Sequence, residues 1–176
     1  MSEIKKINLP LTESTIKELH AGDEVLITGE IYTARDAAHS RLVKLIKENK
    51  PLPINLNNAT IYYTGPTPTK PGDVIGSCGP TTSYRMDEYT NDLLKQGLKV
   101  MIGKGARSEE YRQALVDYQA IYISAIGGTA ALIASTVKEC HLVCYEDLGA
   151  EAIYHLRVEN FYGIVTYDIY HNSIFK

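Results

Sequence analysis

The sequence has few cysteines, no tryptophan and little net charge. Its 176 residues include only three cysteines, Cys78, Cys140 and Cys144, and three thiols cannot all pair. We therefore expect no disulfide scaffold, which agrees with a reducing compartment. Lys and Arg total 18 and Asp and Glu total 21, so the net charge is −3, and no basic run is present. This balance argues against wholesale binding to a nucleic-acid backbone or an acidic membrane surface.

Long hydrophobic runs are also missing. The longest nearly uncharged stretch, residues 120–137, is interrupted by Gly127 and Gly128 and predicts a buried strand and helix, not a membrane span. The first residues have no apolar core of signal-peptide length, so we expect a cytoplasmic protein. Length and a hydrophobic content of 44% indicate one ordinary globular domain. We divide it into an N-terminal arm, residues 1–20, and a single catalytic domain, residues 21–176.

The spacing Cys140-His141-x-x-Cys144 resembles a metal motif. Leu142 and Val143 indicate a strand here, on which the two cysteines would share a face, and no second pair of ligands follows. Two buried structural thiols are the favoured interpretation, and we expect no metal ligands in this chain.

From residue 22 onward, predicted strands and helices alternate. Strands are predicted at 23–33, 59–64, 74–78, 98–102 and 120–125, and helices at 34–49, 83–96, 108–118 and from about 129. Thr33 and Asp36 resemble a capping box, and Ser108 is the expected N-cap of its helix. The alternation predicts an α/β fold with parallel strand pairs, and β-rich segments near both ends predict a second β layer.

Four predicted strands run into a polar or glycine turn that opens a helix. The turns are residues 32–36, 78–83, 103–107 and 126–129. Such turns gather at the carboxyl ends of parallel strands, where ligands bind. Three of them carry a cation near the helix start, namely Arg35, Arg85 and Lys104. A cation near the N-terminus of a helix opposes the helix dipole and costs a little stability. Because three cations are placed in this way, we favour a site at which they bind an anion.

The alternative is that these cations lie in water or pair with Asp36, Asp87 or Glu88. Neither a Walker A loop nor a G-x-G-x-x-G motif is present, because Gly105 and Ser108 occupy the required positions. Cations with neighbouring hydroxyls suit a small carboxylate instead.

The same turns hold further candidate groups. His39 lies one turn after Arg35, where it is either a proton shuttle or a hydrogen-bonded structural group. Thr81 and Thr82 are candidate pocket hydroxyls, although one of them, or Ser83, is also a candidate N-cap.

At these turns the chain resembles the β subunit of the iron–sulfur-dependent class I fumarate hydratase and L(+)-tartrate dehydratase family. The matching segments are residues 34–42 (ARDAAHSRL), 62–66 (YYTGP), 79–87 (GPTTSYRMD), 103–105 (GKG) and 147–153 (DLGAEAI). The resemblance covers nearly the whole chain beyond residue 20, and RDAAH together with GPTTxxRM carries its specificity.

The resemblance implies a swivelling β/β/α three-layer domain with a partly parallel central sheet. It also implies reversible hydration of a small dicarboxylate, with malate and fumarate as the expected pair. In this family the substrate-binding residues map onto Arg35, Thr82, Arg85 and Lys104, and the proposed base maps onto Thr81. The [4Fe–4S] cluster, with one open iron that acts as a Lewis acid, belongs to an α part and not to this chain.

The expected partners are therefore an α subunit and a small dicarboxylate, in an α2β2 assembly or with a β–β dimer. Two alternatives stay open. One is L(+)-tartrate or another hydroxy-diacid as substrate, since cations recognise carboxylates and not the rest of the molecule. The other is a stand-alone carboxylate-binding or regulatory domain without catalysis.

Overall fold

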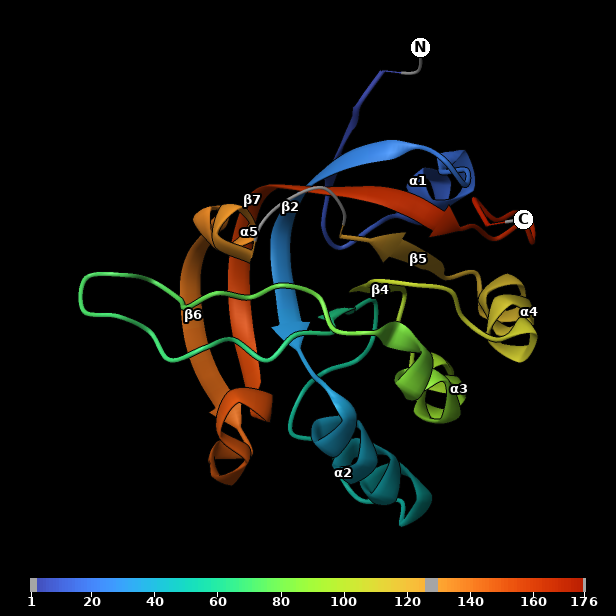
Figure 1. The fold of residues 1–176 in the computed structure, drawn as a ribbon. Coiled ribbons are helices and arrows are strands. Elements are labelled where there is room, and N and C mark those ends of the chain that lie inside the picture. Colours follow the sequence, from blue (N-terminus) through green and yellow to red (C-terminus); the bar gives the residue numbers. More distant parts are fainter. Residues whose placement is uncertain (1–2, 126–129, 176) are drawn as a thin grey trace.

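A computed structural model describes residues 3–125 and 130–175 and shows a mixed α/β fold (Figure 1). Its elements, in chain order, are β1 (Lys5–Asn8), α1 (Glu13–Glu18), β2 (Glu24–Thr33), α2 (Asp36–Lys47), β3 (Thr60–Tyr62), the 3-10 helix η1 (Ser83–Met86), α3 (Asp87–Lys95), β4 (Val100–Gly103), α4 (Glu109–Tyr118), β5 (Ile121–Ser124), α5 (Ala130–Ser135), β6 (Val137–Cys144), the 3-10 segment η2 (Glu146–Glu151) and β7 (Ile153–Tyr167). The predicted α/β class is confirmed.

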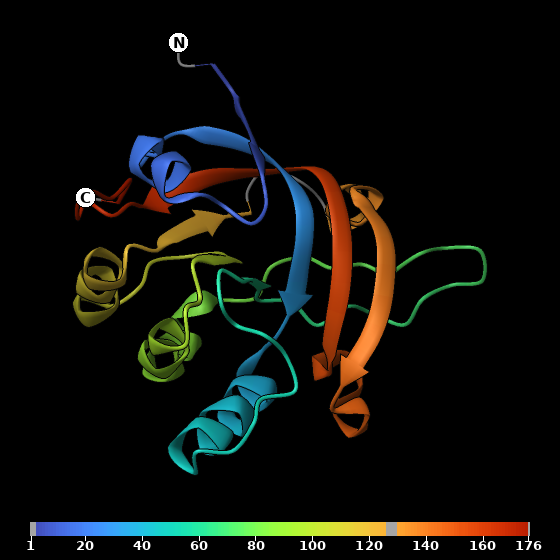
Figure 2. The same ribbon diagram turned by 180° about the vertical axis from the view of Figure 1, so that it is seen from behind.

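The strands form one sheet that closes on itself. Its order is β1-β2-β3-β4-β5-β7-β6, and neighbours among the first five strands are parallel. The 15-residue strand β7 runs antiparallel to β2, β5 and β6 (Figure 2). Because β7 pairs with both β2 and β5, the strands β2, β3, β4, β5 and β7 close into a barrel. No helix in the described part of the chain is long and apolar enough to cross a membrane.

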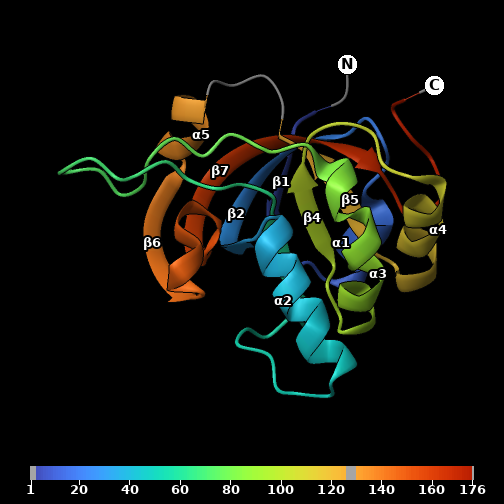
Figure 3. The same cartoon turned by 60° about the horizontal axis from the view of Figure 1, so that its bottom comes forward.

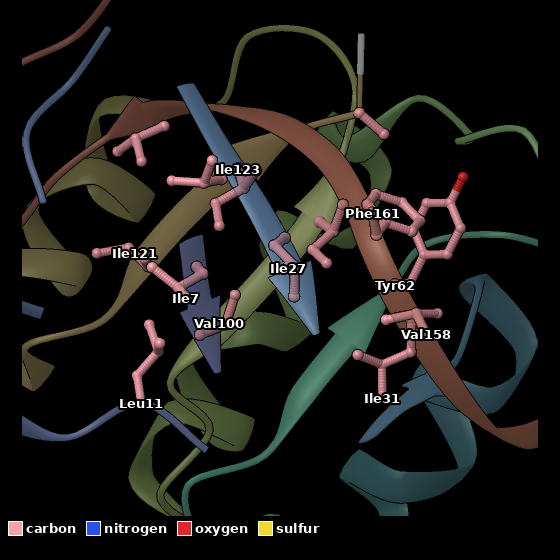
Figure 4. Close-up of a cluster of buried hydrophobic side chains, with 14 of the residues drawn as sticks. Ile7, Leu11, Ile27, Ile31, Tyr62, Val100, Ile121, Ile123, Val158 and Phe161 are labelled. Atoms are coloured by element: carbon pink, nitrogen blue, oxygen red, sulfur yellow. The ribbon is translucent and has the colours of Figure 1, made fainter. Parts of the chain in front are cut away.

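Alternation along the strands divides the buried side chains into two clusters. Ile121 and Ile123 belong to a cluster inside the barrel, together with Ile27, Val158 and Phe161 (Figure 4). Tyr122 lies between the two isoleucines and joins a second cluster between sheet and helices. Successive strand residues point to opposite faces, so β5 contributes to both clusters.

Helices α2, α3 and α4 lie side by side over one face of the sheet (Figure 3). Leu42 of α2, Leu93 of α3 and Leu115 of α4 are fully buried in the cluster beneath them. Ser108 caps α4 as predicted, because its hydroxyl accepts a hydrogen bond from the Tyr111 amide at 3.2 Å. This packing fixes the ends of the helices that face the turns.

Three local predictions are wrong. Residues 74–78 form no strand but one side of a long loop that runs outward past β6 (Figure 1). Thr33 does not cap α2; Arg35 occupies the N-cap position without a side-chain bond. The Thr33 hydroxyl accepts a hydrogen bond from the Tyr154 amide at 3.1 Å, because β2 continues to Thr33 and β7 begins beside it.

The third wrong prediction is that the two cysteines of β6 share a face. Cys140 and Cys144 are half-buried and free, and they pack against different clusters. A register shift between Leu142 and Cys144 changes the alternation, so the two thiols do not share a face.

Residues of the predicted N-terminal arm contribute to the barrel core. β1 pairs in parallel with β2, with Ile7 opposite Ile27. Leu11, Ile16 and Leu19 are buried in the barrel cluster. Apolar burial therefore ties this segment to the sheet.

Candidate active site

Three of the four predicted turns meet at one edge of the sheet. The fourth, with Gly127, Gly128 and Thr129, lies outside the described residues. The Ala34 amide donates to the Tyr62 carbonyl at 3.1 Å, and the Thr81 amide donates to the Tyr63 carbonyl at 2.8 Å. Thr82 forms a parallel backbone bridge with Lys104. Backbone hydrogen bonds thus bring the turns after β2 and β4 beside residues 79–83.

Side chains of the first two turns form a connected charged group. Arg85 Nε donates to Asp36 Oδ2 at 3.0 Å, and Arg85 Nη2 lies 3.5 Å from Asp36 Oδ1. The same Nη2 donates to Thr81 Oγ1 at 3.2 Å. A guanidinium at this distance favours the charged form of a hydroxyl, because it stabilises negative charge on the oxygen.

Arg35 lies next to this group, and its guanidinium has carboxylates nearby but not at hydrogen-bond distance. Its Nε is 3.9 Å from a carboxylate oxygen of Asp36 and 3.9 Å from one of Glu151. That Nε atom is buried and has no hydrogen-bond partner within the described residues. Glu151 also accepts from the Ala37 amide at 3.5 Å, at the start of α2. Arg35 and Arg85 line an open depression of about 500 Å³ with Asp36, Ser40, Tyr89 and Glu151.

Lys104 differs from both arginines. Its side chain is exposed and takes part in no ion pair with the described residues. Its backbone is held tightly, since the Lys104 carbonyl accepts from the Ser83 amide at 3.0 Å. Thr82 is exposed beside it and occupies the N-cap position of η1 without a capping bond from its side chain. The cation and the hydroxyl are both open to solvent.

His39 lies behind the first turn and is fully buried. Its Nδ1 is 2.8 Å from the Arg35 carbonyl oxygen, so Nδ1 carries the proton and Nε2 is left without a partner in the described structure. The ring packs edge-on against Tyr63, with centroids 5.4 Å apart. Burial lowers the pKa of His39 to about 4, so the ring is neutral at pH 7. His39 thus braces the Arg35 backbone, and its role as a proton shuttle stays a prediction.

A buried arginine, Arg107, connects two of the turns through its hydrogen bonds and ring contacts. Arg107 donates from Nε to Asp87, and its guanidinium carbon lies 3.6 Å from the centroid of the Tyr111 ring. Asp87 also accepts from the Ser108 amide at 2.7 Å. Tyr122 packs on the same guanidinium at 4.9 Å. A buried charge needs such partners, and these connect the turn after β4 to the start of α3.

The sequence allowed two interpretations of the three cations, an anion site or pairing with neighbouring acidic residues. The structure gives a different answer for each cation. Pairing holds for Arg85, whose partner is Asp36, and partly for Arg35. Among the described residues Lys104 has no ion-pair partner, and Asp87 pairs with Arg107 instead. Sequence reasoning assigned no role to Glu151 and considered Ser83 only as a candidate N-cap, although Glu151 lies in the matching segment 147–153 and Ser83 follows the two threonines directly. Neighbouring positions in the chain were the signal that could have identified both.

Metal ligands are not gathered in the described part of the chain. No group of three or more His, Cys, Asp or Glu side chains there is placed to hold a metal ion. Cys78 is buried under the turns, where burial raises its pKa to about 12 and disfavours the thiolate that metals require. The described residues therefore do not fit an iron–sulfur cluster.

Comparisons with known proteins identify a family that matches the whole chain. The model of a family described as the fumarase C-terminus matches residues 1–176. A protein of Methanocaldococcus jannaschii, provisionally named L(+)-tartrate dehydratase subunit beta, is 40% identical over 172 residues, which cover 94% of this chain and 88% of that protein.

Longer relatives match over one part of their length. The anaerobic class I fumarate hydratase of Escherichia coli K12 is 37% identical over 97% of this chain and 32% of its own length. Mitochondrial fumarate hydratase 1 of Leishmania major is 38% identical over 85% of this chain and 28% of its own length. The chain therefore spans about a third of these enzymes and nearly the whole of the archaeal protein.

Proposed function

This chain belongs to the fumarase C-terminal family, and from that premise we propose that it is the β subunit of a hydro-lyase. The reaction is the reversible addition of water to a small unsaturated dicarboxylate, with (S)-malate and fumarate as the expected pair. The observation that carries the proposal is the single edge at which Arg35, Thr81, Arg85 and Lys104 meet, with Thr81 Oγ1 3.2 Å from Arg85 Nη2.

The chemistry of dehydration accounts for these groups. Removing a proton from the carbon beside a carboxylate places negative charge on that carboxylate. Arg35, Arg85 and Lys104 stabilise this charge as it develops. A hydroxyl acts as a base only where its alkoxide is favoured, and the Arg85 guanidinium supplies that condition at Thr81. Thr82, exposed beside Lys104, contacts the substrate in this scheme.

The dicarboxylate must compete for the arginines. Asp36 holds Arg85 and lies near Arg35, so an incoming carboxylate joins a site that already contains two acidic groups, Asp36 and Glu151. Lys104 has no such competitor among the described residues. We infer that Lys104 binds one carboxylate directly and that the Arg35–Arg85 pair shares the other with Asp36.

The remaining chemistry comes from a partner. Expulsion of hydroxide requires a Lewis acid, which a [4Fe–4S] cluster with an open iron supplies when bound. Because the described residues do not fit a cluster, we propose that an α subunit holds it and faces this edge. An α2β2 complex, or a β–β dimer within it, is the proposed assembly. The swivelling β/β/α arrangement and a cytoplasmic location belong to the same proposal.

L(+)-tartrate is the alternative substrate. It is favoured by the archaeal relative, whose name is that of a tartrate dehydratase subunit and which this chain nearly spans. The fumarate hydratases favour malate instead. Both substrates present two carboxylates to the same cations.

Anaerobic co-expression with a cluster-binding α subunit tests the function. We expect a stable complex that acts on one of two substrates, either the malate and fumarate pair or L(+)-tartrate. D-tartrate is the stereochemical control. The chain alone, treated with iron and sulfide, should show neither cluster absorbance nor hydratase activity. Separate species in sedimentation and malate binding by the chain alone would instead support a stand-alone carboxylate-binding domain.

A further inference from the structure

Two buried hydroxyls join the turn that holds the threonines to the turn that holds Lys104. Ser83 Oγ accepts a hydrogen bond from the Lys104 amide at 3.0 Å. The Tyr122 hydroxyl lies 2.8 Å from Ser83 Oγ and 2.9 Å from the Gly105 carbonyl oxygen. Ser83 and Tyr122 are both fully buried. We call this pair the hydroxyl bridge.

The hydrogen bonds of the bridge form one connected chain. The Tyr122 hydroxyl donates to the Gly105 carbonyl oxygen, which can only accept. The same hydroxyl is the donor toward Ser83 Oγ, so its single proton is shared between the two acceptors. Ser83 Oγ accepts from the Lys104 amide. The chain of hydrogen bonds therefore begins at the Lys104 amide and ends at the Gly105 carbonyl, which encloses the peptide unit after Lys104.

The surroundings fix the bridge in place. The Tyr122 ring packs between the Arg107 guanidinium, 4.9 Å from its centroid, and the Tyr167 ring, 5.5 Å away. Burial raises the pKa of Tyr122 to about 12, so its hydroxyl keeps its proton near neutral pH. Glycine at position 103 leaves room for Ser83, since a Cβ there would lie 1.9 Å from Ser83 Oγ.

Backbone bonds already join these two turns without the bridge. The Ser83 amide already bonds the Lys104 carbonyl, and Thr82 already pairs with Lys104 through the backbone. The hydroxyl bridge adds a second, side-chain connection on the other side of the same residue. Its effect is to fix where the Lys104 side chain leaves the backbone relative to Thr81 and Thr82.

We propose that Ser83 and Tyr122 are positioning residues for the reaction, which hold Lys104 at a set distance from the threonine pair. This proposal rests on the proposed function. Neither hydroxyl reaches the solvent-exposed edge, so each acts through the Lys104 turn and not on the substrate itself.

Three variants separate positioning from structural support. Tyr122→Phe removes one hydroxyl and keeps the ring on Arg107, and Ser83→Ala removes the other. Tyr111→Phe is the matched control, because Tyr111 is also buried and packs on the same guanidinium, while its hydroxyl donates to Met101 Sδ at 3.2 Å and takes no part in the bridge. The double variant of Ser83→Ala and Tyr122→Phe tests whether the two hydroxyls act as one unit.

The first measurement is amide hydrogen exchange at Lys104 by NMR on the full chain, which needs no partner and no activity. We expect exchange about tenfold faster in Ser83→Ala and in Tyr122→Phe, and within about twofold of the original chain in Tyr111→Phe. Unchanged exchange at Lys104 in both bridge variants would overturn the bridge, whatever the enzyme does.

The second measurement is steady-state kinetics of the complex with the α subunit. We expect each bridge variant to lower kcat/KM about three- to tenfold, and the double variant to lower it no further. Two effects that multiply in the double variant, or equal losses in Tyr111→Phe, would show general packing and contradict positioning. An original complex without hydratase activity would overturn the proposed function, while exchange at Lys104 would still decide the bridge.

Discussion

The candidate site has two sides that are built differently. On the Arg35 side, which comprises Arg35, Asp36, Thr81 and Arg85, the side chains hold one another by charge, with Arg85 Nε 3.0 Å from Asp36. On the Lys104 side, which comprises Thr82, Ser83 and Lys104, backbone bonds and buried hydroxyls hold the turn. The cation of the Lys104 side has no ion-pair partner among the described residues, whereas the arginines have carboxylates near them.

The two sides show two ways of orienting a cation, and they differ in how available the charge is to a ligand. Side chains that are held by ion pairs are oriented but already partly neutralised. A turn that is held by its backbone orients its side chain indirectly and leaves the charge free. We therefore expect packing defects to destabilise the Lys104 side more than the Arg35 side.

Gly103→Ala tests that prediction and has the largest expected effect. Its Cβ would lie 1.9 Å from Ser83 Oγ and 2.8 Å from a ring carbon of Tyr63, so buried groups must move. We expect the free energy of unfolding to fall by about 2–3 kcal/mol. Chemical denaturation of the full chain measures it.

Gly65→Ala is the matched control on the Arg35 side. The Cβ there would lie 3.2 Å from the flexible Arg35 Cδ and 3.2 Å from the Ala150 carbonyl oxygen. We expect a loss below about 1 kcal/mol. Equal losses in the two variants would remove the distinction between the sides.

Thr81→Ala tests the chemistry of the Arg35 side. A lost base should reduce kcat of the assembled complex on the order of a hundredfold, with an almost unchanged melting temperature. Its hydroxyl contacts Arg85 and caps no helix, so little stability depends on it.

Thr82→Ala is the comparison variant on the Lys104 side. Thr82 is exposed and makes no capping bond, so we expect a change in KM with kcat nearly kept. A normal kcat in Thr81→Ala would show that Thr81 is not the base, and proton abstraction would then be assigned to His39 or to a group on the α subunit.

His39 gives the Arg35 side a dependence on pH. Its pKa is about 4 in the folded chain and near 6.5 unfolded, so the unfolded chain binds the proton first as pH falls. The folded state loses stability as pH falls from about 6.5 to about 4, by about 2 kcal/mol between pH 7 and pH 5.

Denaturation at both pH values should show this loss in the original chain and a smaller one in His39→Leu. His141→Gln, at an exposed position on β6, should keep the original dependence. An equal loss of stability in His39→Leu would show that His39 is not the source of the pH dependence.

Much of the fold was predictable because apolar spacing reports buried faces. The helix over 36–47 follows from apolar residues at helical spacing, and the helix over 109–118 follows from Ser108 as N-cap and the acidic residues in its first turn. Residues 74–78 look like a strand from their apolar residues, yet they lie in the long loop, where the Thr67 amide donates to the Ser77 carbonyl at 2.9 Å. Closure of the barrel was not predictable, because it depends on β7 pairing with both β2 and β5.

The site was predictable as a set of turns but not as a pattern of charge. Strand order brings Arg35, Thr81 and Lys104 to one edge, which follows from alternation of strands and helices. The choice of Asp36 as partner for Arg85 depends on side-chain positions across 49 residues of chain. The hydroxyl of Tyr122 reaches Ser83 only because β5 lies next to β4 in the sheet.

The proposed function requires that the cations of both sides bind the dicarboxylate in the assembled enzyme. The most direct test is kcat/KM of the complex for Arg35→Ala, Arg85→Ala and Lys104→Ala, with Arg41→Ala as control. Arg41 lies on α2, pairs with Asp147 at 2.9 Å and is not among the residues that line the depression of Arg35 and Arg85. We predict at least a roughly tenfold loss for each site variant and a change within about twofold for the control. Near-normal kcat/KM in all three site variants would contradict the account.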